Sequence, residues 1–107
     1  MKTVHKYEIN LHDLDRESMA MVKIRKGATL LSVGTQRFGY VAIWAQVDTE
    51  TPMRDWQIWI YGTGHTIAAP DTAKFLGTVF MDGLVFHVFY EATDGVFYKP
   101  GDFRIDG

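Results

Sequence analysis

The stretch VFMDGLVFHVF, residues 79–89, decides the fold of this 107-residue chain. At its centre the pair Asp82-Gly83 separates two runs of apolar residues. An Asp-Gly pair supplies the two positive φ angles of a type I′ turn, a common connection of a two-residue β-hairpin. We therefore expect antiparallel strands at residues 75–81 and 84–90.

The two-residue turn also predicts which side chains lie opposite each other across the hairpin. On one face it pairs Thr78 with His87, Phe80 with Val85 and Leu76 with Phe89. On the other face it pairs Met81 with Leu84, Val79 with Phe86, Gly77 with Val88 and Phe75 with Tyr90. Both faces are apolar, whereas a hairpin with one solvated face would alternate apolar and polar residues.

The segment WQIWIY, residues 56–61, has the same two-sided apolar pattern. Trp56, Ile58 and Ile60 fall on one side, and Trp59 and Tyr61 fall on the other. Such strands are central, covered on both sides, or pressed against a second subunit. We expect a homo-oligomer, most simply a two-fold dimer, or a broad aromatic binding surface.

Seven short runs of apolar and β-favouring residues recur along the chain, separated by turn formers. They are residues 3–9, 19–24, 29–33, 40–47, 56–61, 75–81 and 84–90. This spacing predicts one all-β domain, an antiparallel sandwich or partly closed barrel of about seven strands. At most a helical turn is expected, at residues 71–74. Residues 92–107 lose the alternation and are predicted to be a loosely packed C-terminal extension.

Composition excludes several classes of function. Hydrophobic residues make up 47% of the chain, and eleven basic against thirteen acidic residues give a formal charge of −2. This balance leaves no excess of positive charge that would attract duplex nucleic acid or an anionic membrane. Cysteine is absent, so disulfides and cysteine-ligated zinc are excluded. No signal peptide or membrane span is recognisable, and we expect a cytoplasmic protein.

The segment YGTGHTI, residues 61–67, is the most informative candidate for a ligand-binding loop. It lacks the third glycine of a dinucleotide-binding fingerprint and the Lys-Ser/Thr of a P-loop. It is therefore either a plain turn at a strand end or a donor-rich corner. In the second case Thr63, His65 and freed backbone N–H groups could meet a phosphate or a hydroxyl.

Catalytic and metal-binding motifs are missing. His87 lies in mid-strand with Thr78 as its predicted hydrogen-bond partner, which favours a structural role for this histidine. His65 and His87 have no histidine or cysteine at ligand spacing, so we expect no metal site. Ser18 and Ser32 are not in a nucleophile elbow. We expect no enzymatic activity and no cofactor; a hydrolase using the two histidines is the weaker alternative.

Tryptophans and arginines supply the remaining candidates for a binding surface. Buried indole N–H groups need partners, and three tryptophans are many for a chain of this length, so some are expected to line a surface. Arg37 and Arg54 fall in predicted turns. An aromatic wall with guanidinium groups at its rim suits a nucleobase with its phosphate.

The segments GATLLSV, YVAIWAQVD, IYGTGH and FLGTVFMDGLVFHVF together resemble a family of small tailed-bacteriophage proteins. The likeness covers residues 6–91. It implies a phage origin and action in the host cytoplasm, and it brings no established chemistry. By analogy with other small phage proteins, it suggests an inhibitor of host defence that captures a nucleotide immune signal as an oligomer.

These observations lead to one hypothesis and two alternatives. The hypothesis is a non-catalytic nucleotide-binding protein whose ligand contacts seven residues, namely Thr63, His65, Trp59, Trp44, Arg37, Arg54 and His87. Thr63 and His65 would contact phosphate or ribose, a tryptophan would stack on the base, and an arginine would neutralise charge. The alternatives are an inhibitor that binds a host defence protein through an aromatic surface, and a phage structural or assembly accessory protein.

Overall fold

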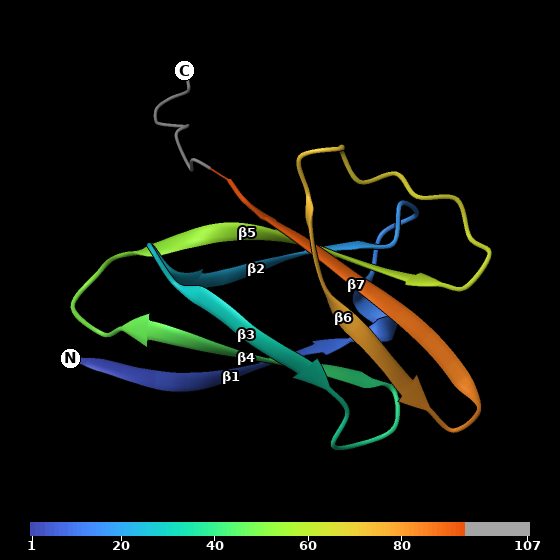
Figure 1. Ribbon diagram of the computed structural model, residues 1–107, viewed down its shortest axis with the longest axis horizontal. Helices are drawn as coiled ribbons and strands as arrows, with labels where there is room; N and C mark the ends of the chain where they lie inside the picture. Colours follow the sequence, from blue (N-terminus) through green and yellow to red (C-terminus); the bar gives the residue numbers. More distant parts are fainter. Residues whose placement is uncertain (94–107) are drawn as a thin grey trace.

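Two antiparallel β-sheets pack face to face in the computed structural model, which describes residues 1–93 (Figure 1). The three-stranded sheet has the order β1-β4-β3 and the four-stranded sheet the order β2-β5-β7-β6. The strands are β1 (Lys2–Asn10), β2 (Met19–Arg25), β3 (Thr29–Gly34), β4 (Tyr40–Asp48), β5 (Met53–Gly62), β6 (Lys74–Met81) and β7 (Leu84–Ala92). The predicted seven-stranded all-β domain is confirmed, as an open sandwich rather than a closed barrel.

Helical structure within residues 1–93 is limited to one 3-10 turn, η1 (Leu11–Asp13). The helical turn expected at residues 71–74 is instead a hydrogen-bonded turn, in which the N–H of Ala73 donates to the carbonyl of Pro70 over 2.9 Å. No helix within the described part of the chain is long and apolar enough to cross a membrane. Most of the extension predicted at residues 92–107 lies outside the described residues.

The β6–β7 hairpin has the predicted turn. Asp82 and Gly83 both have positive φ, at 49° and 85°. The register holds as far as Gly77, which pairs with Val88. Beyond this point a bulge shifts β6, so the predicted pairs Phe75–Tyr90 and Leu76–Phe89 are wrong. Phe75 instead pairs with Phe89, and Lys74 with Tyr90.

Apolar side chains from both sheets form the core between them. Its largest fully buried side chains are Ile24, Val41, Ile43, Val47, Ile58 and Val88. Trp56, Ile58 and Ile60 point into this core, as the alternation in β5 predicts. Where β3 lies over β6, Gly77 leaves only enough room for a methyl group of Val33. The inter-sheet contact is therefore close at this point.

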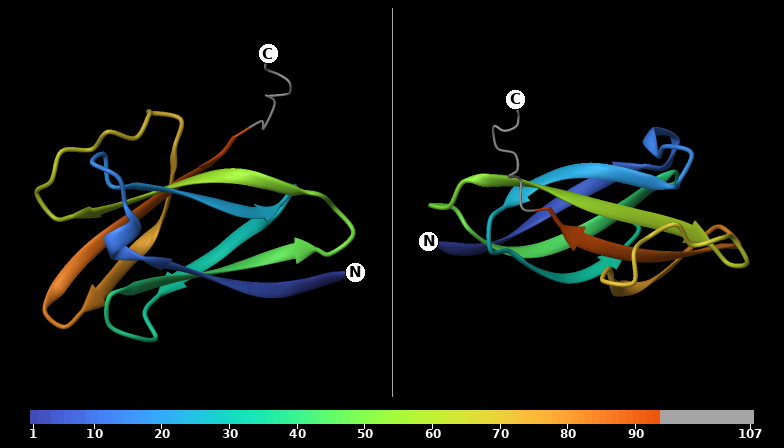
Figure 2. Two further views of the ribbon diagram at one scale, coloured as in Figure 1. Left: turned by 180° about the vertical axis from the view of Figure 1, so that it is seen from behind. Right: turned by 90° about the horizontal axis from the view of Figure 1, so that it is seen from above.

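The outer face of the four-stranded sheet is covered at one end and open at the other. Trp59 and Tyr61 point to this face but are only 4% and 3% exposed. The loop of residues 63–73 runs from the end of β5 to the start of β6 (Figure 2). It is held against this face because the Tyr61 hydroxyl accepts the N–H groups of Ala68 and Ala69. Phe80, in contrast, is 72% exposed. The chain's own loop therefore covers part of this face. The expected homo-oligomer stays a prediction.

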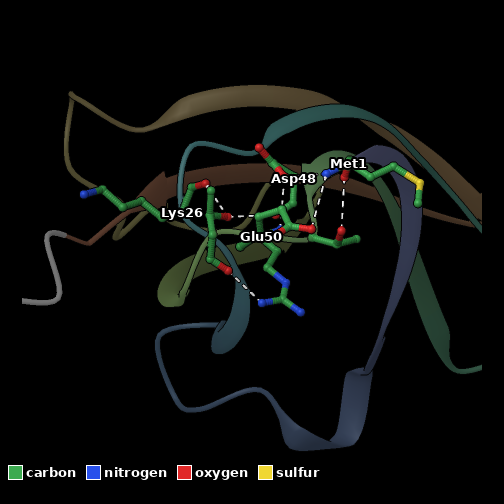
Figure 3. A network of polar contacts seen from close by, with 7 residues as sticks. Met1, Lys26, Asp48 and Glu50 are labelled. Carbon is green, nitrogen blue, oxygen red and sulfur yellow. Dashed lines mark hydrogen bonds and ion pairs between the residues drawn. The ribbon is translucent and has the colours of Figure 1, made fainter.

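A small polar network ties the start of β1 to the end of β4 (Figure 3). The Asp48 carboxylate accepts the N–H of Glu50 at 3.0 Å and the Met1 ammonium at 3.1 Å. The N–H of Thr49 donates to the Met1 carbonyl. The Glu50 N–H, followed by the Met1 ammonium, holds the pKa of Asp48 below its ordinary value, because both stabilise the charged form.

Candidate functional site

The YGTGHTI segment is a tight turn at the end of β5. The N–H of His65 donates to the carbonyl of Gly62 over 3.1 Å, and Gly64 has a φ of 90°. The His65 ring lies against Gly62, where a Cβ would come within 2.9 Å of Cε1 of the ring. Each glycine therefore has its own role: Gly64 adopts the turn conformation, and Gly62 makes room for the imidazole.

His87 joins this turn to the hairpin. Its Nδ1 lies 3.0 Å from the Thr78 hydroxyl, which confirms the predicted partner. Its Nε2 lies 2.7 Å from the Thr63 hydroxyl, a contact that the sequence did not predict. Because a hydroxyl can donate or accept, both ring nitrogens are paired in either tautomer. His87 thereby fixes the position of Thr63, which is otherwise an exposed turn residue.

Two hollows flank the pair Thr63 and His65. The smaller, of about 210 Å³, is lined by these residues and His87 on one side and by the apolar side chains Tyr61, Ile67, Phe75 and Phe89 on the other. The larger, of about 490 Å³, reaches from the same pair to the tip of the β6–β7 hairpin at residues 83–86. We call Thr63, His65 and His87 the polar corner. It offers hydroxyl and imidazole groups to a ligand in either hollow.

The other predicted site residues do not join the polar corner. Trp59 is on the same face of the sheet but is buried, beside Phe89 in the strand pairing. Trp44 is on β4 of the other sheet, between the buried residues Ile43 and Ala45, so alternation points it out of the opposite side of the sandwich.

The two arginines lie elsewhere as well. Arg37, in the loop between β3 and β4, pairs with Glu8 at 3.0 Å and lies 3.6 Å from the ring centroid of Tyr40. Arg54 was expected in a turn, which is wrong, because β5 begins at Met53 and Arg54 pairs with Ile24 of β2. Neither guanidinium lines the two hollows beside the corner.

Sequence reasoning missed the apolar half of this site. Phe75 and Phe89 form its floor, with ring centroids 5.3 Å apart, and they face each other only because of the bulge in β6. It also missed Tyr61 as the anchor of the loop above. A tyrosine on the outward side of a strand that ends in a long loop was the available signal.

The polar corner consists of hydroxyl and imidazole groups. None of its members is a carboxylate, and residues 1–93 contain no group of three or more His, Asp or Glu side chains that could hold a metal ion. Hydroxyl and imidazole groups are suited to hydrogen bonding a phosphate, a ribose or a carbonyl.

Comparison with known proteins gives a family but no function. Residues 1–96 match the sequence model of a family described as a domain of unknown function, DUF7352. No curated protein and no solved structure matches the chain.

Proposed function

We infer that this chain, which belongs to the DUF7352 family, is a non-catalytic protein that binds and sequesters a small nucleotide-type ligand. The observation that carries this proposal is the polar corner itself. Residues 63 and 65 of a turn and residue 87 of a strand meet between two hollows. The hydrogen bond between Thr63 and His87 fixes the position of the Thr63 hydroxyl before the ligand binds.

The sizes of the two hollows suggest which part of the ligand each one holds. The smaller hollow, at about 210 Å³, is below the range of roughly 300–1,000 Å³ that is usual for whole small-molecule ligands. We assign it to the base, which would lie against Phe75 and Phe89. The phosphate or ribose then meets Thr63 and His65, and the rest of the ligand enters the larger hollow. These phenylalanines take the place of the tryptophans in the original hypothesis.

The net charge of the chain indicates that an anionic ligand would be recognised by local hydrogen-bond donors. The chain has a formal charge of −2 and no basic patch, so an anionic ligand must be held by a few nearby donors. His65 is exposed and its ring is held beside Gly62, which makes it the principal donor in this proposal. Arg37 and Arg54 have no part in it.

The biological role that fits best is counter-defence by a tailed bacteriophage. A protein that holds a nucleotide immune signal without destroying it would lower the concentration of that signal in the host cytoplasm. This part of the proposal rests on the sequence resemblance and on the lack of a catalytic motif. Homo-oligomerisation through the open end of the outer face, around Phe80, belongs to the same proposal.

A second candidate function is inhibition of a host protein. Phe38 is 69% exposed and Phe80 is 72% exposed, and both line a shallow hollow between the β3–β4 loop and the hairpin tip. The Thr35 hydroxyl holds the two segments together by donating to the carbonyl of Phe80 over 3.4 Å. Aromatic side chains presented in this way are typical of protein-binding hot spots.

Titration calorimetry on matched histidine variants tests the principal proposal, using cyclic and ADP-ribose-type nucleotides. His65→Ala should weaken binding by about tenfold to a hundredfold, since a hydrogen bond to a charged group is worth about 1.5–3 kcal/mol. His5→Ala is the control, because His5 is exposed on β1 of the other sheet. Equal affinities of wild type and His65→Ala would contradict the assignment of the site.

Gly62→Ala provides a second variant that keeps the imidazole but moves it. The new methyl group must displace the His65 ring, whose Cε1 lies 2.9 Å from the Cβ position. If the ring has to be in its observed place to bind, Gly62→Ala weakens binding nearly as much as His65→Ala. Wild-type affinity in Gly62→Ala would exclude the observed ring position from the binding geometry.

A further inference from the structure

A fourth hollow lies between the two sheets, away from the polar corner. It has a volume of about 470 Å³ and is lined by the start of β3, the start of β6, the end of β7 and Trp56 of β5. Its volume is within the usual range of small-molecule sites, which is roughly 300–1,000 Å³. It shares no lining residue with the two hollows of the corner.

Trp56 has a buried donor without a partner. Its side chain is 6% exposed, and its indole Nε1–H is the only buried side-chain polar group within residues 1–93 that lacks a hydrogen bond. A buried donor without a partner destabilises the folded protein. Because this nitrogen is itself buried, an acceptor in the hollow would reach it through a small shift of the indole, and the new hydrogen bond would recover the lost free energy.

An aromatic wall and a cation complete the hollow. The rings of Trp56 and Tyr90 are stacked, with centroids 6.1 Å apart and an interplanar angle of 30°. The β6 bulge places Lys74 opposite Tyr90, whereas an unbroken register would place it opposite Glu91. Bulges often re-aim a side chain next to a functional site. Glu91 also lines the hollow, but side chains alternate along β7, so its carboxylate belongs to the opposite face of the sheet from Tyr90.

We propose that this hollow binds a planar heteroaromatic ring that carries an anionic group. The ring lies against Trp56 and Tyr90, and one of its acceptors takes the indole N–H. The anionic group meets the Lys74 ammonium together with the hydroxyls of Thr29 and Thr72, which also line the hollow. The site is additional to the polar corner and does not depend on the function proposed for the corner.

NMR titration of the full-length ¹⁵N-labelled protein tests this site, with adenosine 5′-monophosphate as the probe. The Trp56 indole N–H resonance reports directly on a new hydrogen bond. We expect a saturable shift of this resonance with adenosine monophosphate and a weaker response to adenosine or inorganic phosphate alone. Lys74→Met should weaken binding by about tenfold, whereas Lys2→Met, on β1 of the other sheet, should leave it unchanged.

The outcomes separate this proposal from that of the corner. The inference is overturned if the Trp56 resonance shows no saturable shift up to about 10 mM probe, because a dissociation constant above that concentration is too weak for a specific site. An unchanged affinity in Lys74→Met overturns it too. Shifts at His65 and Thr63 alone support the corner and refute the hollow, whereas a Trp56 shift that persists in His65→Ala supports the hollow independently.

Discussion

Gly77→Ala tests how closely the two sheets fit together. A Cβ on Gly77 would lie 2.9 Å from Cγ1 of Val33, and ordinary contact begins at 3.4 Å, so the sheets must yield by 3.4 − 2.9 = 0.5 Å. Overpacking of a core by a methyl group costs about 1–3 kcal/mol. Replacing a glycine returns about 0.4–1 kcal/mol through the unfolded state. We expect a net loss of about 1–2 kcal/mol in the free energy of unfolding.

Urea unfolding measures this loss, and thermal unfolding should show a midpoint lowered by about 4–8 °C for each kcal/mol lost. Val33→Ala removes the methyl group that Cβ would strike, so the double variant should be more stable than the sum of the two single losses predicts. We expect a coupling of about 0.5–2 kcal/mol. The packing of β3 on β6 is refuted if Gly77→Ala is as stable as wild type, or if the two losses simply add.

Three further substitutions test local features. Tyr61→Phe removes the acceptor of the Ala68 and Ala69 N–H groups, so these amides should exchange about tenfold faster, and unchanged exchange would exclude the anchor. Asp48→Asn should lower stability more at about pH 7 than at about pH 2. The pKa of Asp48 is lowered on folding, so its contribution is present above the unfolded pKa and is lost as the pH falls through the folded pKa. An equal loss at both pH values would contradict this linkage. Gly83→Ala should lower the free energy of unfolding by about 1 kcal/mol in urea titrations, because Gly83 has a φ of 85°; wild-type stability would argue against the turn.

Local chemistry made most of the fold predictable. The Asp82-Gly83 pair specifies a turn of two residues, and that turn fixes the partner of each nearby residue, including Thr78 for His87. Alternation in β5 correctly places Trp56 toward the core and Trp59 on the other face. These features depend on neighbours in sequence or across one turn, so pattern and spacing are sufficient.

The bulge in β6 could not be predicted in this way. It lies next to the point where β6 meets β3 across the sandwich, where Gly77 and Val33 are in close contact. Sequence alternation carries no information about which strands face each other between two sheets. Without this information, Phe75 was expected to pair with Tyr90, and the hollow between Lys74 and Trp56 could not be predicted.

The candidate site was predicted in part for a similar reason. Thr63 and His65 share one turn, so their proximity follows from the sequence. Trp44 was grouped with them as an aromatic residue, but it belongs to a strand of the other sheet. Arg54 follows the turn signals near Pro52, and β5 begins between them, at Met53. Assembly of a site from distant segments requires the strand order, which residue patterns do not supply.

Native mass spectrometry tests the central proposal most directly. The full-length protein would be purified from bacteria whose nucleotide-signalling defence has been activated, and its mass measured before and after heat denaturation. The proposal predicts an oligomer that retains a nucleotide and releases it intact, and a His65→Ala protein that retains much less. Wild-type protein that carries no nucleotide, or that releases only a hydrolysed product, would contradict sequestration at the polar corner.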